Sequence, residues 1–285
     1  MIPAAFDYHR PDTIDAAVGL LAEHGEEARV VAGGHSLIPM MKLRMAYLSH
    51  LVDLRDVQEM QGITVDGDTV TLGAMVTQHE LITSDALSSV APILREASLQ
   101  IADPQVRYMG TIGGNVANGD PGNDIPGLMQ ALDAKFVLAG PEGRRTVDAR
   151  GFYEAAYMTA REDEEILTHI RFRSVAGMGY AYEKQKRKIG DYATAAAAVL
   201  VAKDGDTISE ARIAMTNLSD TPIFSEGAGA ALVGTSGDGA AVAAAIAAMQ
   251  ADIDPAEDNR GPVEFKRHVA GVMLSRAINS ALSRA

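Results

Sequence analysis

The chain has 285 residues, 47% of them hydrophobic and 22% charged, which is typical of a globular protein with two domains or one elaborated domain. Its formal net charge of −13 argues against nucleic acid and anionic membranes as partners, because both are bound through dense Lys and Arg. It has no Cys, which excludes disulfides, iron–sulfur clusters, thiolate zinc sites and a cysteinyl flavin link within the chain.

The first residues contain no basic segment followed by an apolar run, and no stretch approaches about 18 uninterrupted apolar residues. We therefore expect no membrane span. A cytoplasmic protein is the simplest interpretation, and a peripheral position at the inner face of the membrane stays open.

Residues 1–56 have the pattern of a small α/β unit. Asp12 can cap a helix that Gly25 can end, and the apolar residues between them recur at helical spacing. Residues 29–32 and 51–54 are the predicted strands.

The first of these strands runs directly into Ala32-Gly33-Gly34-His35-Ser36-Leu37. Paired glycines leave backbone amides open to phosphate oxygens, because no Cβ stands in the way. The segment therefore indicates a phosphate loop, with an ordinary tight turn as the alternative. His35 can donate to a phosphate, attach a flavin covalently or fill a polar niche. No second His or carboxylate lies at metal-ligand spacing near it, so no metal site is predicted.

Residues 57–173 are predicted to form a mixed α+β region. Asp66-Gly67 between two apolar runs predicts a hairpin of residues 62–65 and 69–73. Thr77 and Glu80 predict a capping box, and residues 90–101 predict one longer helix.

A second glycine pair lies in Thr111-Ile112-Gly113-Gly114-Asn115, which we expect to be a loop between regular elements. Two phosphate loops in one chain suggest one diphosphate. The polar residues 118–124 that follow are typical of a turn exposed to solvent. Asp124 alternatively suits the hydroxyls of a ribose or ribityl chain, because phosphates would repel its carboxylate.

Residues 178–285 are predicted to form a separate C-terminal α+β domain after a linker at Gly177-Met178-Gly179. Strands are expected at 196–202 and 208–215, and helices at 240–251 and 263–282. The short basic run 184–188 is expected on the solvated surface. Alternatively, Tyr192 stacks on a planar ring and a lysine meets negative charge.

Other well-known sites are not supported. Neither glycine segment has the spacing of a Rossmann dinucleotide fingerprint or of a P-loop. No G-x-S-x-G segment occurs, and Ser36 and the histidines do not form a nucleophile and base pair, so hydrolysis is disfavoured.

The ordered motifs resemble the FAD-binding medium subunits of molybdenum hydroxylases, with the carbon monoxide dehydrogenase branch as the closest likeness. The resemblance covers essentially the whole chain. It rests on the two glycine segments, Asp120-Pro121 with Asp124, and residues 6–11, 101–105 and 186–194. It implies an α+β fold: a two-subdomain FAD-binding domain of the vanillyl-alcohol-oxidase type over 1–177, divided at about residue 56, and a small α+β domain over 178–285.

The resemblance also implies the site. FAD would be bound noncovalently, with Asp124 near its polar groups, Leu167 and Lys184 near the cofactor, and Tyr192 at the isoalloxazine ring. No catalytic residue and no metal ligand are implied. The diphosphate would be held by Ala32, Gly33, Gly34, His35, Ser36, Leu37, Thr111, Ile112, Gly113, Gly114 and Asn115.

The partners implied are a small subunit with two [2Fe–2S] clusters and a large subunit with the molybdenum cofactor, in a dimer of heterotrimers. The chain would relay electrons from the clusters through FAD to an external acceptor such as quinone and would be inactive alone. Three alternatives stay open: a subunit of a related aldehyde, nicotine or purine dehydrogenase, a self-sufficient covalent-flavin oxidase, and a cofactor-free assembly module.

Overall fold

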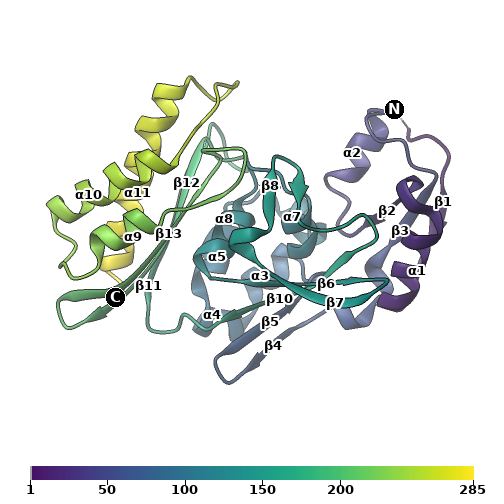
Figure 1. The fold of residues 1–285 in the computed structure, drawn as a ribbon, viewed down its shortest axis with the longest axis horizontal. Helices are drawn as coiled ribbons and strands as arrows, with labels where there is room; N and C mark the ends of the chain where they lie inside the picture. The colour runs from purple at the N-terminus through teal and green to yellow at the C-terminus, as the bar shows by residue number, and fades with distance from the viewer. Residues whose placement is uncertain (1) are drawn as a thin grey trace.

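The computed structural model describes residues 2–285. Sheets of three, five and four strands follow one another along the chain, and Figure 1 shows them from the N-terminal unit on the right to the C-terminal unit on the left. No helix in residues 2–285 is long and apolar enough to cross a membrane.

The N-terminal unit is a parallel sheet in the order β1-β3-β2. Its helix α1 begins after Thr13, whose hydroxyl accepts from the Ala16 amide at 3.2 Å, so the predicted cap at Asp12 is wrong by one residue. Gly25 ends α1 as predicted, with φ of 53°. The elements are β1 (Asp7–His9), α1 (Ile14–His24), β2 (Ala28–Val31), α2 (Leu37–Lys42) and β3 (His50–Asp53).

The middle unit is an antiparallel sheet in the order β4-β5-β10-β6-β7, with a two-stranded ribbon of β8 and β9 beside it. Its strands are β4 (Ile63–Asp66), β5 (Thr69–Gly73), β6 (Lys135–Gly140), β7 (Gly143–Asp148), β8 (Tyr153–Ala155), β9 (Met158–Thr159) and β10 (Ile166–Arg173). Its helices are α3 (Gln78–Thr83), α4 (Asp85–Val90), α5 (Pro92–Ser98), α6 (Pro104–Met109), α7 (Ile112–Ala117) and α8 (Asp124–Ala131).

Local sequence signals account for several of these elements. The hairpin at Asp66-Gly67 and the capping box of Thr77 with Glu80 are confirmed. The single helix predicted over 90–101 is wrong, because α4 ends at Val90 and α5 restarts at Pro92. Proline has no amide to donate to a preceding turn, and it is well accommodated at the first position of a new helix.

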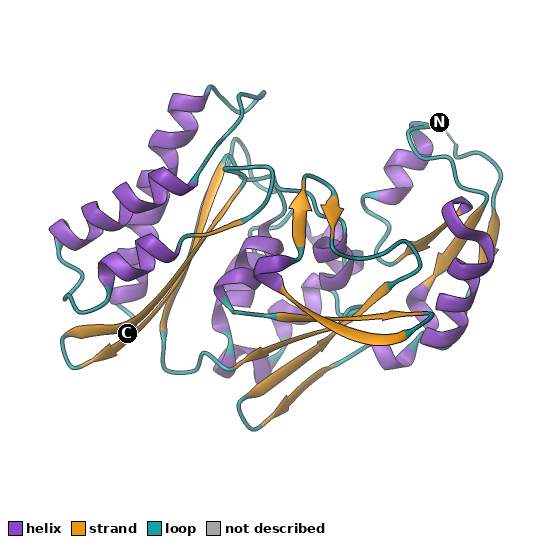
Figure 2. Ribbon diagram, in the orientation of Figure 1, coloured by secondary structure: helices purple, strands orange, loops and turns teal. Residues whose placement is uncertain are grey.

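The C-terminal unit is an antiparallel sheet in the order β11-β12-β13-β14, and the expected hairpin and helices are confirmed. Figure 2 shows helices on one side of this sheet, with the middle unit on the other. The elements are β11 (Gly179–Gln185), β12 (Ala195–Asp204), β13 (Thr207–Thr216), β14 (Ile223–Phe224), α9 (Glu226–Leu232), α10 (Gly239–Asp252) and α11 (Val263–Leu282). Short 3₁₀ helices lie at Gly25–Glu27, Leu54–Asp56, Gln58–Met60 and Ala149–Gly151.

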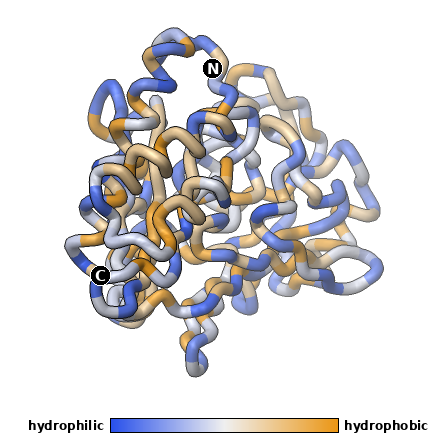
Figure 3. Tube along the Cα trace, turned by 60° about the vertical axis from the view of Figure 1, so that its left-hand side comes forward, coloured by the Kyte–Doolittle hydropathy of each residue, from blue (hydrophilic) through white to orange (hydrophobic). Residues whose placement is uncertain are grey.

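Both faces of the C-terminal sheet are buried. Successive side chains of a strand point to opposite faces, so one strand contributes to two cores. On β12, Ala196, Ala198 and Leu200 join the core of the middle unit, whereas Ala197 and Val199 join the core under α9 to α11. Figure 3 shows orange, hydrophobic stretches among the segments and blue, hydrophilic residues at many outer turns. The sheet thus binds the two halves of the molecule together.

Candidate functional site

The two glycine segments lie in direct contact. A Cβ atom at Gly33 would lie 2.3 Å from the carbonyl oxygen of Met109, just before the second segment. A Cβ at Gly114 would lie 3.6 Å from that of Ala32. Segments almost 80 positions apart in the sequence therefore form one structure at the end of β2, as their predicted common ligand requires.

The first segment presents a series of free amides. Gly34 has φ of 76°, which reverses the chain after β2 and favours glycine. Among the residues that the structure describes, no acceptor receives the amides of Gly33, Gly34, His35, Ser36 or Leu37. Successive amides on a reversed backbone form a concave surface that binds anionic oxygens.

The second segment differs from its prediction. Thr111 caps α7, so residues 112–115 form a helical turn, and the expected loop of open amides is wrong. The Ile112 and Gly113 amides donate to the carbonyls of Val76 and Ala74, and the Gly114 amide donates to Thr111 Oγ1. A Cβ at Gly113 would lie 2.4 Å from that of Ala74. Close packing therefore explains this glycine better than amide exposure does.

The Asn115 side chain nevertheless leaves a polar atom without a partner. Its Oδ1 is buried and has no hydrogen bond in the described residues, whereas its backbone carbonyl accepts from Asn123 Nδ2 at 3.1 Å. A buried polar atom without a partner is unfavourable, so this position suits a ligand that can supply a donor. The contact with Asn123 also ties α7 to the polar segment 118–124.

A cavity of about 260 Å³ opens between the two segments and reaches toward α3 and the end of α6. Ala32 and Thr111 line it as expected for predicted site residues. The remaining lining residues were not predicted, since Thr77 and Glu80 signalled only a helix cap and the others had no sequence signal. They are Arg55, Gln61, Gly62, Met75, Val76, Thr77, Glu80, Tyr108 and Met109.

Tyr192 lies beside the polar segment 118–124. A Cβ at Gly122 would lie 3.1 Å from the Tyr192 ring, and the tyrosine is 44% exposed. Partial burial raises the pKa of its hydroxyl, and Asp120 adds to the shift. Gly122 packs against the ring and the Arg260 guanidinium carbon lies 5.6 Å from the ring centroid, while the residue keeps an accessible surface that a further planar group can contact.

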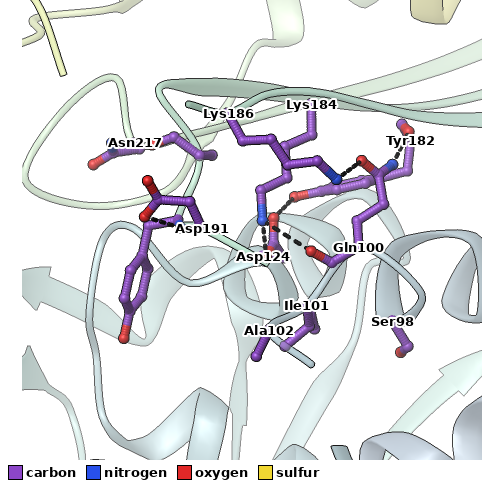
Figure 4. Close-up of polar contacts among 12 residues, drawn as sticks. Ser98, Gln100, Ile101, Ala102, Asp124, Tyr182, Lys184, Lys186, Asp191 and Asn217 are labelled. Carbon is purple, nitrogen blue, oxygen red and sulfur yellow. Dashed lines mark hydrogen bonds and ion pairs between the residues drawn. The ribbon is translucent and has the colours of Figure 1, made fainter. Parts of the chain in front are cut away.

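Asp124 forms a buried polar cluster with two residues of β11. Figure 4 shows Tyr182 and Lys184 converging on it from the strand above. Lys184 Nζ lies 2.7 Å from Asp124 Oδ2, and the Tyr182 hydroxyl donates to Oδ1 at 2.5 Å. The Lys184 side chain is 1% exposed, so its expected place on the solvated surface is wrong.

Burial dominates the electrostatics of this cluster. It raises the pKa of Asp124 despite the opposing charge of Lys184, and it raises the pKa of Tyr182 well above the ordinary value. Burial also lowers the pKa of Lys186, whose ammonium bonds to Gln100 Oε1 at 3.2 Å. With Tyr182 and Lys184 both donating to it, Asp124 has both oxygens engaged by protein groups.

Leu167 does not join the other predicted site residues directly. It is 4% exposed in β10, opposite Leu138 and next to a bulge in the pairing of β10 with β6. The adjacent Thr168 carbonyl accepts the Ala74 amide, and the Ala74 carbonyl accepts the Gly113 amide. Leu167 therefore lies behind the second glycine segment, in the core.

Two family models match the chain. The first, the FAD binding domain in molybdopterin dehydrogenase, covers residues 4–172, and the second, the CO dehydrogenase flavoprotein C-terminal domain, covers residues 180–281. The predicted architecture of an FAD-binding domain followed by a small C-terminal domain is confirmed.

Relatives match over the full length. The carbon monoxide dehydrogenase medium chain of Afipia carboxidovorans (strain ATCC 49405 / DSM 1227 / KCTC 32145 / OM5) is 57% identical, over 100% of this chain and 99% of that one. The caffeine dehydrogenase subunit beta of Pseudomonas sp. (strain CBB1) is 32% identical, over 100% and 97%. A chain of the crystal structure of the cyanide-inactivated Cu,Mo-CO dehydrogenase superposes with a TM-score of 0.98 at 57% identity, and the match covers all of both chains.

Proposed function

Because this chain belongs to the family of FAD-binding subunits of molybdopterin dehydrogenases, we propose that it is the electron-relaying medium subunit of a carbon monoxide-oxidising complex. Electrons would pass from [2Fe–2S] clusters of a small subunit through FAD to an external acceptor such as quinone. A large subunit with the molybdenum cofactor would oxidise the substrate.

The amides of Gly33 to Leu37 carry this proposal. They have no acceptor among the described residues and lie on a reversed backbone, and Ala32, which precedes them, lines the cavity. These residues fit the FAD diphosphate, and the His35 and Ser36 side chains can add donors. From the second segment, Thr111 and Asn115 would contribute polar side chains and Gly114 would let the segments approach closely, while Ile112 and Gly113 would hold the segment against Val76 and Ala74.

The other predicted residues would act around this anchor. Tyr192 would pack at the isoalloxazine ring, and Asp124 would lie near polar groups of FAD. Lys184 would hold the Asp124 carboxylate in place, and Leu167 would support the second segment from the core. The FAD-binding domain would span 1–177, in subdomains of about 1–56 and 57–177, and the C-terminal domain 178–285.

When bound, FAD supplies the redox centre that accepts electrons and passes them on. This chain's residues bind and orient it, and electron transfer needs no acid–base side chain from them. We therefore assign no catalytic residue. The binding would be noncovalent, and a cytoplasmic location with peripheral contact at the inner membrane face would suit the relay to quinone.

Exposed apolar residues beside the flavin segment support assembly with partner subunits. Leu43, Met45 and Tyr47 follow α2 and are 54%, 69% and 72% exposed, and Tyr108 and Met109 at the end of α6 are more than half exposed. Apolar groups gathered on a surface mark interaction sites. We expect the iron–sulfur subunit to cover them, in a dimer of heterotrimers.

One assay tests the electron-relay role of this chain and the carbon monoxide assignment separately. The native complex should oxidise carbon monoxide with a dye or quinone acceptor, and this chain alone should have no turnover. Activity only on an aldehyde, a purine or a nicotine-like heterocycle would contradict the carbon monoxide assignment. Turnover by the isolated chain would contradict the relay. Acid precipitation tests the noncovalent bond, because flavin retained on the polypeptide would implicate His35.

A further inference from the structure

Three histidines from separate parts of the N-terminal unit gather in one cluster outside the glycine segments. His9 ends β1, His24 ends α1, and His50 begins β3. Their ligand-capable nitrogen atoms all lie within 4.8 Å of one another. No motif in the sequence signals this cluster, because the fold alone brings the three residues together.

The imidazole rings are closely packed. His9 Nε2 and His50 Nδ1 are 3.1 Å apart, and the rings of His24 and His50 stack with centroids 3.7 Å apart and planes at 7°. The rings of His9 and His24 have centroids 5.5 Å apart. All three residues are half-buried, so each ring is held by packing and remains reachable from solvent.

This spacing suits a transition-metal ion. Zinc binds imidazole nitrogen at about 2.0–2.1 Å in tetrahedral geometry, which separates neighbouring ligand nitrogens by about 3.3 Å. The His9 and His50 nitrogens already have nearly that separation. The remaining nitrogen needs a displacement of at most about 1.5 Å to reach the same distance, and the stacked His24 and His50 rings must rotate out of their parallel arrangement so that both nitrogen lone pairs point at the ion, changes that side-chain rotation can supply.

The surroundings favour a cation. Asp7 Oδ2 lies 3.9 Å from His50 Nδ1, and its side chain is 79% exposed and free to approach. His24 lies in the last turn of α1, where the helix dipole is negative. Arg10, the nearest guanidinium along the chain, is paired with Asp56.

We propose that His9, His24 and His50 bind one divalent transition-metal ion of the zinc type, with Asp7 or water as a further ligand. The ion would join β1, α1 and β3. In the parallel register His50 lies opposite Ala28 at the start of β2, whereas the flavin segment follows the end of β2. His9 lies opposite Val52, nearer that end, and strand β3 separates β1 from β2 and the flavin segment that follows it.

The test is titration of zinc into the FAD-loaded full chain, purified without a histidine tag and treated with a chelator. We expect one equivalent of zinc to bind and to raise the thermal midpoint, because a ligand that binds only the folded state stabilises it. Cobalt should give the visible absorption of a tetrahedral site. His24→Gln should weaken zinc binding by at least about tenfold, since losing even a group that orients a ligand costs about 10- to 100-fold.

The matched control is His268→Gln, which removes an exposed histidine of α11 and should leave zinc binding unchanged. Near-ultraviolet circular dichroism and flavin content confirm that each variant is folded. The proposal is overturned if the unmodified chain gives no tetrahedral cobalt spectrum. It is equally overturned if a His9→Gln, His24→Gln, His50→Gln triple variant binds zinc as the unmodified chain does.

Discussion

Gly34 combines a left-handed backbone with a crowded position. A Cβ there would lie 2.6 Å from Ile38 Cδ1, at φ of 76°. Gly34→Ala should cost about 1–3 kcal/mol of strain and displace the free amides, so flavin content should fall sharply. Gly67→Ala is the control, because Gly67 has φ of 59° in open space at a hairpin turn far along the chain.

The measurement is flavin content per chain beside far-ultraviolet circular dichroism. The control variant should lose comparable stability and keep its FAD. A full complement of FAD in Gly34→Ala would show that the amides of this segment do not anchor the cofactor.

Lys184 is a buried cation whose removal isolates a buried carboxylate. Lys184→Met should destabilise the chain by about 3–5 kcal/mol, because Asp124 would keep its desolvation and lose its counter-charge. Lys135→Met, which removes an exposed ion pair with Asp148, should cost no more than about 1 kcal/mol. Urea unfolding measures both.

Partial rescue distinguishes electrostatics from packing. The double variant Asp124→Asn, Lys184→Met removes both charges and should recover part of the loss, because no unpaired charge remains buried. Equal destabilisation of Lys184→Met and the double variant would assign the effect to lost packing of the lysine stem.

An ion pair that makes stability depend on pH joins β7 to Glu165, the residue just before β10. Arg145 Nε lies 2.6 Å from Glu165 Oε1, and Nη2 lies 2.6 Å from Oε2. The hydrogen bonds from Arg145 hold the pKa of Glu165 below its usual range. A lowered folded-state pKa means that the stabilisation is present above the ordinary glutamate pKa of about 4.3 and is lost as the pH falls through the lower value.

Glu165→Gln should therefore destabilise the chain by about 1 kcal/mol at pH 7 and by much less near pH 3. Urea midpoints at the two pH values give the comparison. Glu164→Gln, at the exposed neighbouring position, should show no such difference. A Glu165→Gln penalty that is the same at both pH values would contradict the charge argument.

Elements built from local signals were predictable, and contacts between distant segments were not. The hairpins, the capping box and the helices over 239–252 and 263–282 follow from turn residues and periodicity that lie within one short window. The second glycine segment was misjudged, because Gly113 serves a contact with Ala74 that no local pattern reveals. Lys184 was placed on the surface for the same reason, since its partner Asp124 lies 60 positions away.

At the scale of the whole molecule, the interface between the domains is a core in its own right. One continuous hydrophobic cluster extends from Ile14 in α1 to Ala214 in β13, and the buried Lys184–Asp124 pair lies within this interface. Helices α5 and α8 pack directly on the C-terminal sheet. Surface of this kind cannot be exposed to water without a large loss of hydrophobic stabilisation.

The chain should therefore unfold as a single cooperative unit although two family models divide it. Calorimetry of the FAD-loaded chain should give one transition whose calorimetric and van't Hoff enthalpies agree. A chain truncated after Gly177 would expose the faces of α5 and α8 that β11 to β13 cover, so it should bind a hydrophobic dye, lose its near-ultraviolet dichroism and hold little FAD. If the truncated chain instead kept FAD with the thermal midpoint of the whole chain, the C-terminal sheet would be an attached domain that contributes nothing to the flavin site.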